Sequence, residues 1–283
     1  MSERHASGQH TRASGKAVTR VAAIQMSSGA DVDANLRAAE ALVTEAAAAG
    51  ATLAVLPENF ALMGAHARDK LAAQERDGNG PQQAFLADAA RRHRMHLIGG
   101  SVPLASETPD RVWQALLAYG PDGSRTARYD KIHLFRFSDG GEEYDEARTI
   151  VPGGTPACLD TPAGRAGLSI CYDLRFPELY RSFGDVALIV VPAAFTYRTG
   201  EAHWETLLRA RAIENQCYVV AAAQTGTHPG GRRTWGHSMI IDPWGVVVAS
   251  RAEGTGVVIA DVDPERIADV RRRLPALAHR SAF

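Results

Sequence analysis

The chain has 283 residues, of which 45% are hydrophobic, so it is long and apolar enough to bury a substantial core. Its 31 Lys and Arg residues nearly balance its 32 Asp and Glu residues, and the formal net charge is -1. That balance gives no electrostatic reason to expect a nucleic acid or an anionic membrane as a partner. No apolar run approaches the roughly 18 residues that a membrane span needs.

The three cysteines, Cys158, Cys171 and Cys217, form no CxxC pair, and their odd number argues against a disulfide framework. No cluster of His, Asp or Glu has the spacing of metal ligands, so no metal is expected. A reducing, cytoplasmic environment fits these features. Residues 1–18 are rich in Ser, Gly, His and Arg and lack the apolar segment of a secretory signal. We therefore expect a disordered tail there and a single domain over residues 19–283.

Short apolar runs alternate with segments of helical periodicity in the first half of this domain. Helices are expected over 33–49, which Gly50 ends, and over 81–94. Strands are expected at 21–26, 52–56, 96–98, 112–118 and 125–129, the last two joined by a turn at 120–123.

The same alternation continues through the second half. Helices are expected from Pro177, because proline suits a first helical turn, and over 201–215 and 264–273. Strands are expected at 157–159, 167–170, 186–191, 218–223, 239–241, 246–249 and 257–262. The elements interleave without a long linker or a repeat, which predicts one α/β domain whose sheets are covered by helices.

Three polar residues stand where predicted strands end: Glu58, Lys131 and Cys171. Ligands of open α/β sheets bind outside the carboxyl ends of strands, so these side chains are candidates for one site. Each alone has a simpler interpretation. A lone cysteine is commonly a small core residue, a glutamate after proline is commonly a turn or cap, and a lone lysine is commonly surface.

The segments around these residues resemble three signature segments of the nitrilase, or carbon–nitrogen hydrolase, superfamily. They are residues 56–59, 129–134 and 170–179, and their order and separation match that family. The resemblance extends over residues 19–278, nearly the whole chain. It implies a four-layer α-β-β-α sandwich and pairing of the chain into a homodimer or a higher homo-oligomer.

The resemblance also implies a role for each residue. Cys171 would be the nucleophile, and Glu58 the general base that later protonates the departing amine. Lys131 would stabilise the thiolate and then the oxyanion of the tetrahedral intermediate, with the Tyr172 backbone N–H as second donor. Ammonia would leave behind a thioester that water cleaves, without any cofactor.

Family members carry a second glutamate after the lysine segment, and this chain offers Glu142, Glu143 and Glu146. Counting back from Pro152, we align Glu146 with it. The alternative is that this stretch is an acidic surface loop, and its length differs from that of close relatives.

The C-terminal third, at 199–224, 236–239 and 242–245, is similar to the Nit branch and, within it, to the deaminated glutathione amidase group. The substrate implied is a small primary amide that carries a carboxylate. Arg175 could hold that carboxylate in a bidentate pair, or could form a structural ion pair with Glu178. Residues 136–138 depart from the relatives, which puts the choice of substrate in doubt.

Other interpretations stay open at this point. An ω-amidase for α-keto acid amides, a nitrilase or a carbamoylase would use the same residues, and a non-catalytic binding protein could keep the fold. An extended strand would place His133 beside Lys131 and suggest a Cys–His pair, but the family pattern favours a structural role. A candidate dimer contact is the face of the 201–215 helix formed by Trp204, Leu207, Leu208 and Arg211.

Overall fold

The computed structural model describes residues 17–139 and 142–281. Residues 1–16, most of the predicted tail, lie outside them, so that prediction is untested. No helix in the described part of the chain is long and apolar enough to cross a membrane.

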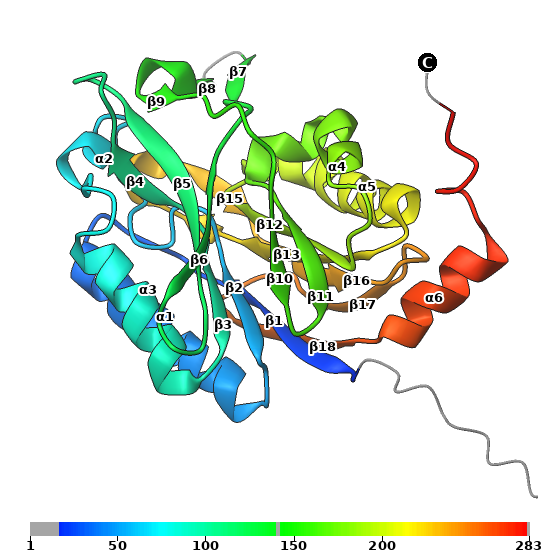
Figure 1. The fold of residues 1–283 in the computed structure, drawn as a ribbon. Coiled ribbons are helices and arrows are strands. Elements are labelled where there is room, and N and C mark those ends of the chain that lie inside the picture. The colour runs from blue at the N-terminus through cyan, green and yellow to red at the C-terminus, as the bar shows by residue number, and fades with distance from the viewer. Residues whose placement is uncertain (1–16, 140–141, 282–283) are drawn as a thin grey trace, which may run out of the picture.

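Two sheets form the centre of the molecule (Figure 1). Within the described residues the first has eight strands, and β6 and β9 both pair with β5. In order across the sheet they are β18 (Gly256–Val262), β1 (Thr19–Gln25), β2 (Leu53–Leu56), β3 (His96–Gly99), β5 (Val112–Tyr119) and β4 (Val102–Ala105), with β6 (Arg125–Asp130) and β9 (Ile150–Val151).

The second sheet has six strands within the same residues. Their order is β10 (Ala157–Thr161), β11 (Gly164–Leu168), β12 (Leu188–Ala193), β13 (Tyr218–Ala223), β16 (Ser238–Ile241) and β17 (Val247–Arg251). Two short hairpins lie outside the sheets: β7 (Arg136–Asp139) with β8 (Glu142–Asp145), and β14 (Thr225–Thr227) with β15 (Arg233–Trp235).

Helices cover the outer face of each sheet (Figure 1). On the first sheet lie α1 (Val32–Ala48) and α3 (Pro81–His93), and on the second α4 (Pro177–Ser182) and α5 (Tyr197–Asn215). Shorter elements are α2 (Asp69–Ala72), α6 (Pro264–Arg273) and the 3-10 turns η1 (Glu146–Arg148), η2 (Cys171–Arg175) and η3 (Pro229–Gly231). The predicted α-β-β-α sandwich is confirmed.

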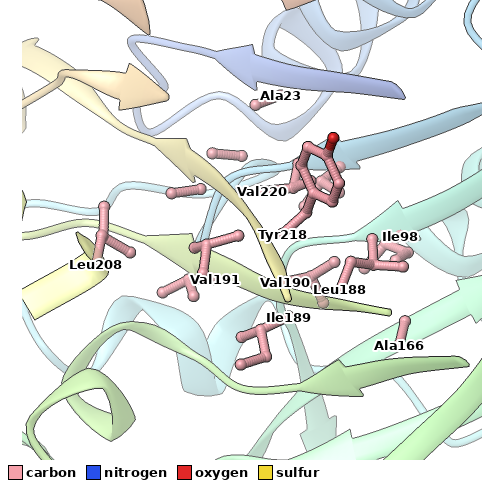
Figure 2. Close-up of a cluster of buried hydrophobic side chains, with 14 of the residues drawn as sticks. Ala23, Ile98, Ala166, Leu188, Ile189, Val190, Val191, Leu208, Tyr218 and Val220 are labelled. Carbon is pink, nitrogen blue, oxygen red and sulfur yellow. The ribbon is translucent and has the colours of Figure 1, made fainter. Parts of the chain in front are cut away.

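The main core fills the space between the two sheets. Every side chain of β12 and β13 is buried, because these parallel strands are covered on both faces. Ala23 and Ile98 of the first sheet meet Leu188, Val190 and Val220 of the second in one apolar cluster (Figure 2). A separate cluster lies between the first sheet and the helices α1 and α3.

Residues 201–215 are helical as predicted, but the helix begins earlier, at Tyr197, although Gly200 in its first turns is a poor helix former. Gly200 is needed there because a Cβ would overlap the Trp235 ring. Residues 131–135 are not a strand, so the alternation that would place His133 beside Lys131 does not apply. The strands β4, β7, β8, β9, β14 and β15 were not predicted.

Two glycines let the backbone close around the strand ends that carry polar residues. Gly100 has a φ of +47°, and a Cβ there would overlap the carbonyl oxygen of Pro57, the residue before Glu58. A Cβ at Gly153 would overlap the carbonyl oxygen of Asp130, the residue before Lys131. Both contacts are with backbone, which cannot rotate away.

We predict that Gly100→Ala lowers the free energy of unfolding by about 1–3 kcal/mol more than Gly78→Ala, both measured by urea denaturation. Gly78 also has positive φ, at +81°, but open space surrounds its Cβ position, so it controls for backbone strain alone. Equal losses in the two variants would mean that the approach to Pro57 is not tightly packed.

Candidate active site

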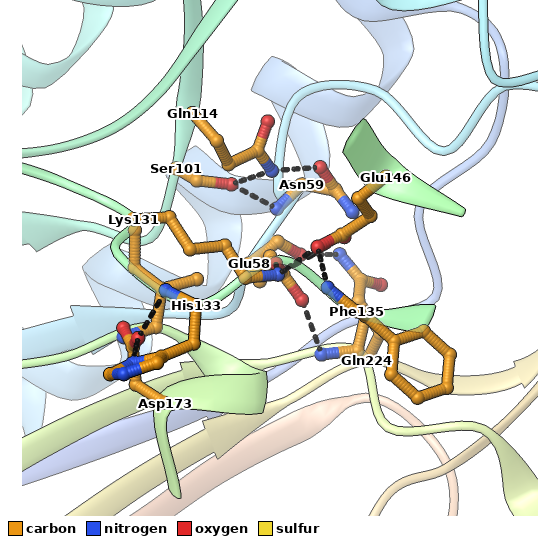
Figure 3. A network of polar contacts seen from close by, with 12 residues as sticks. Glu58, Asn59, Ser101, Gln114, Lys131, His133, Phe135, Glu146, Asp173 and Gln224 are labelled. Carbon is orange, nitrogen blue, oxygen red and sulfur yellow. Dashed lines mark hydrogen bonds and ion pairs between the residues drawn. The ribbon is translucent and has the colours of Figure 1, made fainter. Parts of the chain in front are cut away.

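Polar side chains from both sheets meet at one end of the sandwich (Figure 3). Glu58 follows β2 and Lys131 follows β6, and both strands belong to the first sheet. Cys171 lies shortly after the end of β11, a strand of the second sheet. Sequence reasoning named all three, and the structure brings them together.

A buried ammonium lies at the centre of the site. Lys131 is 0% exposed, and its Nζ is 2.8 Å from Glu58 Oε1 and 2.8 Å from Glu146 Oε2. Burial lowers the pKa of Lys131, but the charges of Glu146 and Glu58 outweigh it and raise the pKa well above its usual value. The two carboxylates therefore favour the charged form of Lys131.

Glu146 is the member of the acidic stretch that enters the site. Its Oε2 also accepts a hydrogen bond from the backbone N–H of Phe135, at 2.7 Å. Burial raises its pKa, but Lys131 and Lys70 outweigh that effect and hold the pKa below its usual value. Glu143 instead pairs with exposed Arg148 at 2.6 Å, and the side chain of Glu142 lies outside the described residues.

The turn that carries Cys171 is strained. Cys171 has a φ of 49°, a conformation that L-residues rarely adopt, and its side chain is 7% exposed. Burial, and next the charge of Glu58, raise the pKa of the thiol well above its usual value. The resting thiol is therefore protonated beside a carboxylate that can accept its proton.

Asp173, two residues after the cysteine, holds this turn in place. Its buried carboxylate accepts hydrogen bonds from Ile170 N at 2.8 Å, His133 N at 3.0 Å and the Tyr129 hydroxyl at 2.7 Å. His133 Nδ1 is also 2.8 Å from it. The His133 ring also stacks on the Phe176 ring, with 3.7 Å between the ring centres. His133 therefore helps to hold the turn through Asp173, beside which it lies (Figure 3).

Glu58 is anchored by both sheets. Its Oε2 accepts a hydrogen bond from the backbone N–H of Ala194, at the end of β12, at 3.0 Å. The Gln224 amide donates to the Glu58 backbone carbonyl at 3.1 Å. Gln224 was not among the predicted site residues, since an amide at the end of a strand carries no specific signal.

Two cavities meet at the site. A narrow one of about 10 Å³ reaches Cys171, Tyr172 and Arg175. A wider one of about 420 Å³ lies outward of it, and the two share Phe135, Glu146 and Arg232 in their walls. The narrow cavity thus adjoins the residue that carries the sulfur, and the wider cavity adjoins the narrow one through the residues that they share.

Arg175 lies at the narrow cavity but forms no ion pair with Glu178 in the described part of the chain. Its guanidinium lies 5.4 Å from the Phe195 ring centre, and Nη1 is 3.3 Å from His203 Nδ1. Tyr172 directly follows Cys171 in η2, so its backbone N–H lies next to the residue that carries the sulfur. Sequence reasoning missed two other cations of the site, Lys70 and Arg232.

Within the described residues, no group of three or more His, Cys, Asp or Glu side chains could hold a metal ion. The other two thiols lie elsewhere. Burial raises the pKa of Cys217 to about 12, and it also raises the pKa of Cys158.

The predicted contact face on α5 is wrong. Trp204, Leu208 and Arg211 are all buried within the chain. Trp204 donates its indole N–H to the His237 carbonyl at 2.8 Å, and Arg211 donates to the Leu174 carbonyl. That face packs inside the protomer because it covers the second sheet and the end of the cysteine turn.

The fold and the site together define the class of protein: an α-β-β-α enzyme with a buried thiol beside a carboxylate and an ammonium, which is an arrangement for acyl transfer. A family model described as carbon–nitrogen hydrolase matches residues 20–272. The chain therefore belongs to the carbon–nitrogen hydrolase family, and it is an amidase within it, as the relatives below are.

Individual relatives agree. The chain is 43% identical over 266 residues to a deaminated glutathione amidase of Synechocystis, covering 92% of this chain and 97% of the relative. It is 36% identical over 266 residues to omega-amidase NIT2 of Mus musculus, covering 93% and 95%. Among solved structures, the NitFhit protein of Caenorhabditis elegans matches with a TM-score of 0.86 and 39% identity, over 95% of this chain and 66% of that one.

We predict that Asp173→Asn lowers the free energy of unfolding by about 1.5–3 kcal/mol, because buried donors lose a charged acceptor and the amide places a donor against them. Urea denaturation measures the change. Asp160→Asn, at an exposed position of β10, is the control and should stay within about 0.5 kcal/mol of the parent. A loss no larger than that of the control would show that Asp173 does not hold the turn.

Proposed function

We propose that this amidase hydrolyses a small amide that carries a carboxylate, of the deaminated glutathione type, and releases the amine part of that amide: cysteinylglycine from deaminated glutathione itself, or ammonia from a primary amide. The observation that carries the proposal is the buried Lys131 ammonium held between Glu58 and Glu146 beside the Cys171 thiol. The name of the Synechocystis relative supports the substrate class.

The first half-reaction forms a thioester. Glu58 accepts the thiol proton while the Cys171 sulfur attacks the amide carbon, so that charge moves to the carbonyl oxygen. Lys131 and the Tyr172 N–H stabilise that oxyanion. Glu58 then gives its proton to the leaving nitrogen, the carbon–nitrogen bond breaks and the amine leaves, as ammonia where the amide is primary.

The second half-reaction restores the enzyme. Glu58 takes a proton from water, whose oxygen attacks the thioester carbon, and the same donors stabilise the second oxyanion. The carbon–sulfur bond breaks and the sulfur recovers a proton from Glu58. Glu146 is placed to hold Lys131 in position throughout, because Nζ donates to both of its carboxylate oxygens, at 3.0 Å and 2.8 Å.

An ω-amidase acting on α-keto acid amides is the second candidate, and the similarity to omega-amidase NIT2 favours it. Both substrates present a carboxylate and an amide, whose nitrogen is unsubstituted in α-ketoglutaramate and belongs to cysteinylglycine in deaminated glutathione. Release of cysteinylglycine from deaminated glutathione and of ammonia from α-ketoglutaramate, with glutamine, a simple nitrile and a carbamoyl amino acid as comparisons, decides between these candidates and the other reactions of the family.

We predict that Cys171→Ala abolishes ammonia release, because it removes the nucleophile. Glu58→Gln should lower kcat at least about 10²-fold, since it cannot accept the proton. Lys131→Met should lower kcat about 10²–10³-fold by removing a charged oxyanion donor. Steady-state ammonia release measures all three, with circular dichroism to confirm folding.

The matched comparison for these variants is His133→Asn, which keeps a hydrogen-bonding group toward Asp173 and should lose clearly less rate than Glu58→Gln. A Glu58→Gln enzyme with near parental rate beside an inactive His133→Asn enzyme would refute the Glu–Lys–Cys mechanism. It would favour a Cys–His mechanism instead.

We also propose that the chain forms a homodimer in the cytoplasm. Three apolar side chains, Ile213, Trp244 and Val246, are 48%, 49% and 49% exposed. They are neighbours, because Ile213 lies against Gly245, the residue between Trp244 and Val246 in the sequence. Clustered apolar exposure of this kind favours burial against a partner. The three free cysteines fit a reducing compartment.

We predict a dimer by sedimentation velocity at micromolar concentration and a shift toward monomer in Trp244→Glu, because a carboxylate cannot be buried there without a partner charge. Val18→Glu, at another exposed apolar position, is the control and should sediment as the parent does. A parent chain that is monomeric under these conditions would refute the dimer.

A further inference from the structure

Two cations of the outer cavity have no acidic partner in the described part of the chain. Lys70 and Arg232 both line the cavity of about 420 Å³ beside Glu146, and neither forms an ion pair there. The third cation of that wall, Arg148, pairs with Glu143 at 2.6 Å and with Asp145 at 3.7 Å. Unlike Arg148, Lys70 and Arg232 are therefore not engaged in an ion pair within the described residues, and their positive charges are available to a ligand.

Arg232 connects the outer cavity with the inner one. Its Nη2 donates to the Ala194 carbonyl at 2.8 Å, which fixes the guanidinium next to the residue whose N–H holds Glu58. The ring of Tyr144 lies 5.2 Å from the guanidinium. The Nε–H of Arg232 is buried and has no hydrogen-bond acceptor among residues 17–139 and 142–281. A buried guanidinium donor without an acceptor is costly, and an anionic ligand would satisfy it.

Lys70 approaches the same space from the other side. Burial lowers its pKa most, against the opposing charge of Glu146, and the positive charges of Lys131 and Arg232 lower it further. The oxygens of Glu146 already accept from Lys131 and from the Phe135 N–H. The pocket therefore holds two cations close enough to repel each other, while the nearest carboxylate is occupied.

The fold brings these two residues together from distant parts of the chain. Lys70 belongs to the short helix α2, and Arg232 directly follows η3. The two segments touch where Gly230, with a φ of +77°, lies against Ala65, and a Cβ there would be 2.7 Å from the Ala65 carbonyl oxygen. His228 fixes the other end of this loop, with its ring nitrogens 2.8 Å from Ser28 O and 2.7 Å from Thr234 Oγ1.

We propose that Lys70 and Arg232 form a clamp for the substrate's carboxylate, so that the enzyme selects the monoamide of a dicarboxylic acid over a neutral amide. This inference rests on the proposed function and adds to it the residues that determine specificity. The carboxamide occupies the narrow cavity at Cys171, and the carboxylate lies in the outer cavity between the two cations. Arg175, at the inner cavity, then contacts the chain between the two ends.

The kinetic test compares glutaramate, which carries the carboxylate, with pentanamide, which does not. Lys70→Met and Arg232→Met should each lower kcat/KM for glutaramate about 10–100-fold more than they lower kcat/KM for pentanamide, and the additional loss should lie chiefly in KM. Lys70→Arg and Arg232→Lys should recover part of the loss. Arg233→Met is the matched control, since Arg233 points to the Tyr197 ring at 4.2 Å.

A binding test separates the clamp from the chemistry. Glutarate is titrated into the Cys171→Ala protein by calorimetry, and the Lys70→Met and Arg232→Met changes should each raise its Kd at least about 10-fold. If the parent enzyme cleaves no amide, the proposed function fails, and glutarate binding still decides the clamp. No binding of glutarate at millimolar concentration, an unchanged Kd, or equal losses for glutaramate and pentanamide would overturn the clamp.

Discussion

The rest of the site depends on one buried ammonium. A charge removed from water is stable only when it is paired and fully hydrogen-bonded, and Lys131 meets that condition through Glu58 and Glu146. The dependence is mutual, because the two carboxylates that hold Lys131 are themselves held by it. The ion cluster thus fixes the Glu58 side chain beside the nucleophile, and it ties the segment that carries Glu146 to the first sheet.

The site also depends on how the two sheets pack. The base and the ammonium come from the first sheet, and the nucleophile comes from the second. The hydrogen bond from the Ala194 N–H to Glu58 and the contacts of Asp173 with Tyr129 and His133 all cross between them. The apolar core between the sheets therefore sets the distance between base and nucleophile, so a core defect should impair both at once.

The sequence predicts the strand ends well, because buried strands have a clear apolar pattern and the polar residues after them stand out. Lys70 and Arg232 could not be found in this way. Each is an ordinary cation in an irregular segment, and only the approach of Gly230 to Ala65 places them in one cavity. The α5 face was misjudged for a related reason, since Arg211 looks exposed in sequence but is buried by its bonds to the Leu174 carbonyl.

The raised pKa of the Cys171 thiol has a consequence for the chemical durability of the protein. Peroxides and electrophiles react with thiolates, and the first oxidation product of a thiolate is a sulfenic acid. A thiol that stays protonated until a substrate arrives gives such reagents little to attack. Burial of the nucleophile, by disfavouring the thiolate, thus limits its oxidation between turnovers.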